Sequence, residues 1–191
     1  MTSSTDSTRE TWSAAIRYIT GRKAAEESLG FLAHVSGLLD TQPEPAAWGR
    51  AVAQVCVPYL VSGVSIDIAG VDGPVVEPGG RFEPVLAMLR SAAAGADDTP
   101  FVISTHDKLV DVSRTVAGVP DGLSAAVVRL TFRDHVSGQL AVVRTPEHGK
   151  GPLGPADLAV LAELANRVAL GNAYTQACAA AAPRAGSASG G

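Results

Sequence analysis

Two alternating runs of apolar and polar residues, joined by a very short polar connection, constrain the fold of this chain most strongly. They lie in LSAAVVRLTFRDHVSGQLAVVRT, residues 123–145. Alternation with a period of two residues predicts a β-strand, and two such runs around a short turn predict an antiparallel hairpin. The stretch 61–70 alternates in the same way, with Val64, Ile66 and Ile68 on one face. A sheet is therefore expected at the centre of the fold.

Helical periodicity surrounds the predicted strands. Apolar residues recur at spacings of three and four from about Pro45 to Val57, from Pro84 to Gly95, and from Pro155 toward Tyr174. A further short strand is predicted over 100–105. This order of elements predicts an α+β fold, an antiparallel sheet with the N- and C-terminal helices packed on one face. The other face would stay open.

Another predicted helix, from Arg22 to Leu39, carries two adjacent apolar stripes. One has the spacing of a coiled-coil seam and consists of Ala25, Leu29, Leu32, Ser36 and Leu39. The second consists of Phe31, Val35 and Leu38. Two stripes indicate a helix that packs on its own sheet and on a partner chain, whereas one stripe would dock it on its own domain. The alternative is a wide, well-buried helix with no partner chain.

Composition excludes several classes of protein. Of the 191 residues, 46% are hydrophobic and 18% charged, which fits a chain that buries a core. A net charge of −4 without a basic block gives no footprint for nucleic acid or an anionic membrane. Cys56 and Cys178 form no disulfide framework or zinc spacing. With no signal sequence or membrane-spanning run, a cytoplasmic protein is expected.

Two stretches resemble one known family, and a third resembles a junction between signalling domains. The segment RLTFRDHVSGQLAVVRTPEHGKGPLGPADLAVLAELANRVALGNAYTQA resembles the closing half of a GAF domain. The matching residues are Gly138, Leu140, Asp157, Leu161, Leu164, Ala165, Ala169, Asn172 and Ala173. AVAQVCVPYLVSGVSIDIAGVDG resembles the second helix and first strand of the family in its actinobacterial form. YITGRKAAEESL is similar to the junction at which a PAS domain ends and its output helix begins.

The resemblance, which covers about residues 28–178, implies a division of the chain. Residues 1–20 would be a disordered arm or a remnant PAS strand, and 21–41 a connector helix for signalling. Residues 42–178 would be the GAF-like domain, and the small-residue stretch 179–191 a disordered tail.

Catalysis and metal binding find little support in the sequence. A nucleophile, a base and two carboxylates occur in one segment, namely Ser104, His106, Asp107 and Asp111. Adjacent His and Asp side chains generally diverge, so no triad is expected. We therefore expect no enzyme and no metal site. His106 alone, in the loop that the resemblance places over the pocket, is a candidate haem ligand. No cofactor is identified.

The predicted open face of the sheet is the candidate ligand site. Alternation puts Ser65 and Asp67 on one face of their strand, and Val127, Arg129 and Thr131 on one face of another. An acid, a guanidinium and hydroxyls over an apolar floor suit a small polar ligand. The loop and strand implied by the resemblance add Phe101, Ser104 and His106. The alternative is that Asp67 and Arg129 pair with each other or reach solvent, with no ligand.

These expectations combine into a non-catalytic sensory module in signal transduction. It would bind a small molecule or a partner and relay that event through the dimerising helix. A homodimer is expected, with a signalling kinase or phosphatase as the output partner. The alternatives are a ligand-free scaffold for protein–protein interaction and a haem or redox sensor.

Overall fold

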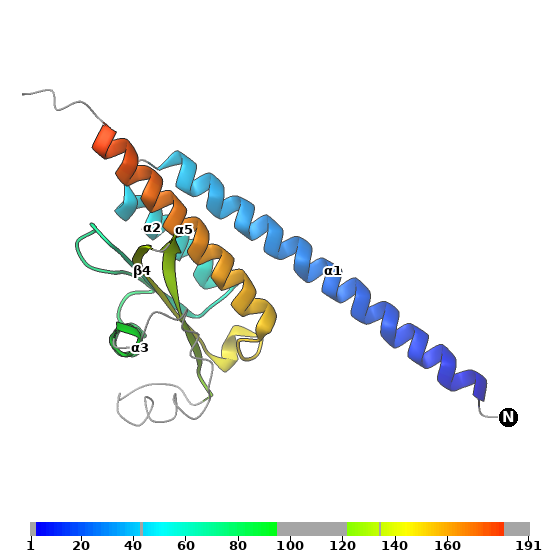
Figure 1. The fold of residues 1–191 in the computed structure, drawn as a ribbon. Coiled ribbons are helices and arrows are strands. Elements are labelled where there is room, and N and C mark those ends of the chain that lie inside the picture. Colours follow the sequence, from blue (N-terminus) through cyan, green and yellow to red (C-terminus); the bar gives the residue numbers. More distant parts are fainter. Residues whose placement is uncertain (1–2, 43, 95–121, 134, 182–191) are drawn as a thin grey trace, which may run out of the picture. The chain divides into compact units, whose positions relative to one another are not determined.

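The hairpin that the alternation predicts lies at the centre of the computed structural model (Figure 1). Its strands are β3 (Ser124–Phe132) and β4 (His135–Arg144), which pair antiparallel. β1 (Gly63–Ile68) pairs antiparallel with β4, and β2 (Val75–Glu77) with β1, so the described sheet has the order β2-β1-β4-β3. The structure describes residues 3–42, 44–94, 122–133 and 135–181, with the backbone alone for 3–17 and 94.

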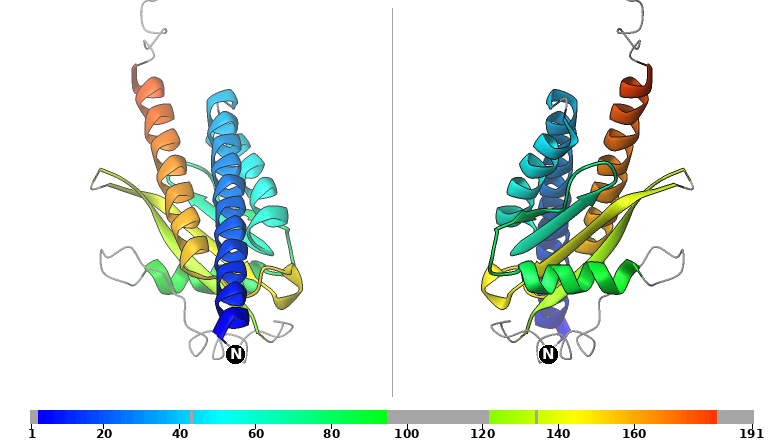
Figure 2. Two further views of the ribbon diagram at one scale, coloured as in Figure 1. Left: turned by 90° about the vertical axis from the view of Figure 1, so that its right-hand side faces the viewer. Right: turned by 90° about the vertical axis from the view of Figure 1, so that its left-hand side faces the viewer.

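Helices pack on both faces of this sheet (Figures 1 and 2). α2 (Pro45–Tyr59) packs on β1 and β2, and α5 (Pro155–Ala181) packs on β3 and β4. Val64, Ile66 and Ile68 face these two helices and are fully or almost fully buried. The fold class is confirmed as α+β with an antiparallel sheet.

The opposite face carries α3 (Glu83–Ala94), which the sequence predicts within one residue at each end. Phe82, Leu86 and Leu89 form one buried cluster with Val127 and Val143 of the sheet. The expectation of an open face is therefore wrong for this part of the sheet. An amphipathic helix must bury its apolar stripe, and the free face of the sheet is the surface available to it.

The N-terminal segment also differs from the expected arm or remnant strand over 1–20. α1 is one helix from Ser3 to Thr41. No proline occurs before residue 43, and Trp12, Ile16 and Ile19 follow the spacings of four and three that a helix requires. The chain divides into two compact units, residues 1–34 and residues 35–191. Among the described helices, none combines the length and the apolar character that a membrane span requires.

An irregularity in the hairpin fixes the register of β4. The pairing shifts between Arg129 and Thr131, and the hydroxyl of Ser137 donates a hydrogen bond of 3.1 Å to the carbonyl of Leu130. Gly138 follows with φ +146°, and a Cβ there would collide with the carbonyl oxygen of Asp67. Only glycine lets β1 approach β4 so closely at this position.

Candidate functional site

Cross-strand pairing orders the residues of the α3 face into rows. In antiparallel strands, paired residues point to the same face, with Cβ atoms about 5 Å apart. Ser65 pairs with Ala141, which pairs with Val127. All three are buried, and Ala141 and Val127 belong to the apolar cluster under α3. Val127, predicted as a ligand contact, is thus part of the hydrophobic core.

Ser65 is a buried polar group whose partner comes from α3. Arg90 donates a hydrogen bond of 2.5 Å from Nη1 to the Ser65 hydroxyl oxygen. Arg90 itself is half-buried. The sequence reasoning found Ser65 but missed Arg90. The sequence does single out Arg90, because it is the charged residue in the otherwise apolar and small run VLAMLRSAAA.

The next row along the sheet is polar across all three strands. Asp67 of β1 pairs with Gln139 of β4, and Gln139 pairs with Arg129 of β3. All three residues are half-buried. Among the described residues, the Asp67 carboxylate makes no ion pair, so pairing between Asp67 and Arg129 is not observed there. Gln139 is the member of this row that the sequence reasoning missed.

The remaining predicted contacts fall away from this row or outside the description. Thr131 follows the pairing irregularity and is exposed. Phe101, Ser104 and His106 lie outside the described residues. The structure thus brings together Ser65, Asp67 and Arg129. We name the group Ser65, Asp67, Arg90, Arg129 and Gln139 the polar row site.

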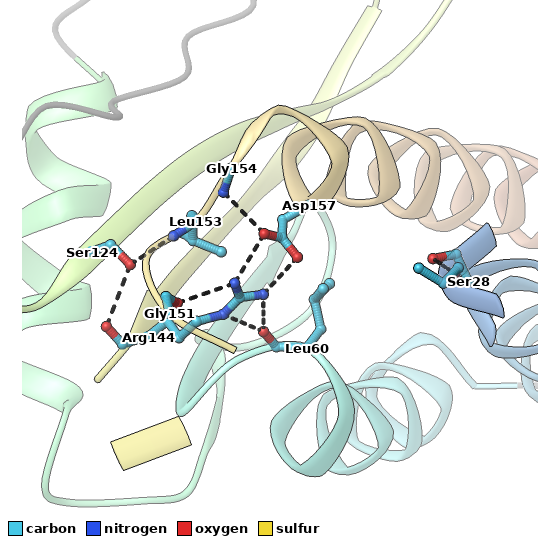
Figure 3. Close-up of polar contacts among 9 residues, drawn as sticks. Ser28, Leu60, Ser124, Arg144, Gly151, Leu153, Gly154 and Asp157 are labelled. Carbon is cyan, nitrogen blue, oxygen red and sulfur yellow. Dashed lines mark hydrogen bonds and ion pairs between the residues drawn. The ribbon is translucent and has the colours of Figure 1, made fainter. Parts of the chain in front are cut away.

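A second polar cluster fixes the start of α5 (Figure 3). The Arg144 guanidinium donates to both carboxylate oxygens of Asp157, at 2.8 and 2.9 Å. It also donates to the carbonyl of Leu60 from Nε at 2.8 Å and from Nη2 at 2.6 Å. Gly154 donates its backbone N–H to Asp157 at 2.9 Å. This arrangement joins the end of β4, the end of α2 and the first turn of α5.

Electrostatics at this cluster favour the charged carboxylate. Burial alone would raise the pKa of Asp157, but the hydrogen bonds from Arg144 and Gly154, with the charges of Arg144 and Lys150, hold it below its usual range. The Arg144 side chain is fully buried, so the pair is shielded from water on that side. We read the cluster as a structural clamp. The resemblance identified Asp157, but nothing in the sequence analysis identified its partner.

His148 lies close to this clamp, in the loop between β4 and α5. Burial lowers its pKa, and the charges of Arg144 and Lys150 lower it further. The carbonyl of Val57 and the carboxylate of Asp157 act in the opposite direction but are outweighed. The pKa of His148 is therefore lowered, which favours the neutral form.

The predicted dimer seam on α1 is not uniform along its length. Leu29 is 66% exposed and Ala25 is also exposed, whereas Leu32 is buried. Nearer the end of α1, Ser36 accepts a hydrogen bond from Arg167 of α5. Leu39 packs against Gly171 of α5, since a Cβ added at Gly171 would lie 3.4 Å from the Leu39 side chain. These last two residues are used within the chain.

The part of the chain that the structure describes holds no group of three or more His, Cys, Asp or Glu side chains that would suit a metal ion. Cys56 is buried, and burial raises the pKa of its thiol to about 12. Cys178 is exposed on α5.

Comparison with known proteins identifies the fold through structure. No family model matches the sequence, and no curated protein matches it. The structure is similar to the GAF domain of a phosphoenolpyruvate-protein phosphotransferase from Acinetobacter, with 14% identity and a TM-score of 0.52. That match covers 78% of this chain and 94% of the other.

Two further solved structures support the same assignment. The GAF domain of the corresponding phosphotransferase from Coxiella burnetii has 14% identity and a TM-score of 0.56, over 82% of this chain and 98% of that one. A biliverdin-bound protein in its far-red absorbing dark state has 13% identity and a TM-score of 0.50, over 76% of this chain and 99% of that one. At such identities the likeness concerns the fold alone. The chain has the GAF fold.

Proposed function

We propose that this chain is a non-catalytic sensory module that binds a small polar ligand at the polar row site. The observation that carries the proposal is the half-buried row Asp67–Gln139–Arg129, which adjoins the partly buried Ser65–Arg90 hydrogen bond. Polar groups that converge beside an apolar floor are the usual composition of a small-molecule site. The similar biliverdin-bound structure holds a ligand, so a protein of similar fold can bind a small molecule.

The residues of the site define what such a ligand must offer. Arginine presents five N–H donors in a planar fork that matches carboxylate or phosphate oxygens. One of the Arg90 donors bonds to Ser65 in the structure. Asp67 accepts hydrogen bonds, and the Gln139 amide both donates and accepts. We therefore expect a ligand with an anionic group toward the arginines and a donor, such as a hydroxyl or amine, toward Asp67.

Relay from this site runs through the strands that carry it. Gln139 and Arg129 belong to β4 and β3, whose opposite faces pack on α5. Packed interfaces switch between discrete arrangements rather than deform continuously. A ligand that shifts β3 and β4 would therefore also shift α5, which packs on them. Residues 35–41 of α1 contact α5 through Ser36 and Leu39, so the last turns of α1 would respond as well.

Dimerisation through α1 and output through a kinase or phosphatase complete the proposal. The exposed part of the seam, Ala25 and Leu29, is the surface offered to a second copy.

The haem alternative depends on His106, which lies outside the described residues, and no described observation favours it.

A thermal-shift screen of nucleotides, carboxylic acids and amino acids tests the ligand site. A true ligand raises the melting temperature of the parent protein, and Asp67→Ala and Arg129→Ala abolish that rise. Asp72→Ala and Arg50→Ala are matched controls, since both residues are exposed and lie on a turn and on α2. A ligand whose effect survives in the two site variants binds elsewhere, and the proposed site is then wrong.

A further inference from the structure

Asn172 is a polar residue in the apolar stripe of α5. The buried residues that precede it on this helix are all apolar, namely Leu161, Leu164, Ala165, Val168 and Ala169. Asn172 continues their spacing and is only 1% exposed. Neither atom of its side-chain amide has a hydrogen-bond partner among the described residues.

Such a residue weakens the attachment of the helix at the point where it sits. A buried amide without a partner loses its bonds to water and gains none in return. Asparagine is also a poorer helix former than the alanines that follow it in this helix. Both effects favour a state in which Asn172 meets water.

The two ends of α5 are held with very different strength. The first turn is fixed by the buried Arg144–Asp157 pair, and the five apolar residues follow. Beyond Asn172, every described side chain as far as Ala181 is exposed or half-buried. In this part a hydrogen bond of 3.3 Å from the Gln176 amide to the carbonyl of Ala69 connects α5 to the end of β1. Segments with so few buried contacts open at low free energy.

We propose that Asn172 is a release point: the segment from Asn172 to Ala181 detaches from the domain as a unit while α5 before it stays anchored. In the detached state the amide is hydrated and the Gln176–Ala69 hydrogen bond is broken. The signalling role of this opening depends on the proposed function, since a ligand at the polar row site would bias it through β3 and β4. The opening itself requires no ligand.

The detaching segment forms one wall of a groove, so its release changes a surface. Leu39 and Asp40 of α1 face Gly171, Tyr174 and Cys178 of α5 across a groove of about 670 Å³. Leu170 and Tyr174 beside it are 52% and 70% exposed. Detachment of α5 beyond Asn172 would move Tyr174 and Cys178 away from the α1 side of this groove, whereas Gly171, which contacts Leu39, would stay in place.

Hydrogen exchange measured by mass spectrometry on the intact chain tests the release point. Asn172→Leu and Asn172→Ala remove the unpaired amide, and Ala does so without adding volume. Asn166→Leu and Asn166→Ala are matched controls, because Asn166 is exposed on the same helix and reports the change in helix propensity alone. We expect both Asn172 variants to slow exchange over 172–181 by roughly tenfold relative to their controls, about 1.4 kcal/mol. Exchange over 158–168 should not change.

Two results would overturn the proposal. Faster exchange over 172–181 in both Asn172 variants, relative to the Asn166 controls, would show that the amide stabilises the attached helix. An equal change along the whole of α5 would show that the helix opens without a boundary at Asn172. Since no ligand is used, failure of this test leaves the ligand site untouched, and failure of the ligand screen leaves this test untouched.

Discussion

Arg144 makes the densest set of polar contacts in the described chain, and its own side chain is fully buried. Its guanidinium bonds to Asp157 and to the carbonyls of Leu60 and Gly151. Removing one partner of a buried ion pair is far more costly than removing an exposed one, because the remaining groups stay desolvated. At the residue scale, the stability of this fold therefore depends strongly on one side chain.

We predict that Arg144→Met lowers the free energy of unfolding by about 3 kcal/mol. Urea denaturation followed by circular dichroism measures the change. Arg22→Met is the control, since its ion pair with Glu26 is 68% and 62% exposed, and it should change the stability by less than about 0.5 kcal/mol. Similar losses in the two variants would mean that the Arg144 cluster does not clamp the fold.

His148 makes stability depend on pH. Its pKa is lowered by burial, so the folded protein binds the proton more weakly than the unfolded chain. As the pH falls below about 6.5, the unfolded chain takes up this proton first and stability declines. We predict that His148→Gln flattens the decline between about pH 7 and pH 5. An unchanged pH profile of the urea midpoint in this variant would contradict the assignment.

At the residue scale, strand alternation predicted which residues share a face of the sheet. Ser65, Asp67 and Arg129 follow from strand alternation, and the structure places them within two adjacent rows of one face. Arg90 and Arg144 did not follow, because each depends on which elements pack together. A helix and a strand that are distant in sequence must first be placed before a hydrogen bond between them can be anticipated.

At the scale of the elements, β4 is a central strand of the sheet, since it pairs with both β1 and β3. Its close approach to β1 requires a residue without a side chain at Gly138, where φ is +146°. Substitution here strains the backbone and also creates a collision with the carbonyl of Asp67. Asp67 and Gln139 of the polar row site adjoin this contact.

We predict that Gly138→Ala lowers the free energy of unfolding by about 3 kcal/mol, whereas Gly79→Ala changes it little. Gly79 is the matched control because its added Cβ would meet nothing within 4 Å. Thermal unfolding by calorimetry measures both variants. A Gly138→Ala protein as stable as the Gly79→Ala protein would show that β1 and β4 do not approach as described.

The elements themselves were predictable in proportion to their length and periodicity. α2, α3, β1, β3 and β4 follow the predicted ranges closely. β2 was not predicted, because its three residues are too few to show alternation. Residues 1–20 were misread, since their short alternating run is equally compatible with a helix and tertiary context decides between the two. α5 also extends to Ala181, into the stretch expected to be a disordered tail, because alanine favours helix.

At the scale of the whole molecule, oligomeric state is the property that links the site to an output. Leu29 is a large apolar residue that is 66% exposed, which makes it the part of the seam that can be changed without disturbing packing within the chain. We predict that Leu29→Asp converts a dimer to a monomer in light scattering. Ala24→Asp, exposed on a different face of α1, should keep the parent mass.

A parent protein that is already monomeric, or a Leu29→Asp variant that remains dimeric, would contradict dimerisation through this seam. This measurement is made without added ligand, so it tests the seam separately from the ligand site.

The central claim is that a small polar molecule occupies the site formed by Asp67, Gln139 and Arg129. Mass spectrometry of metabolites released from the purified protein tests it most directly. The account predicts one anionic compound in near-stoichiometric amount from the parent and the Arg50→Ala control, and its loss from Arg129→Ala. The same compound in equal amount from Arg129→Ala, or identical background from all three proteins, would contradict it.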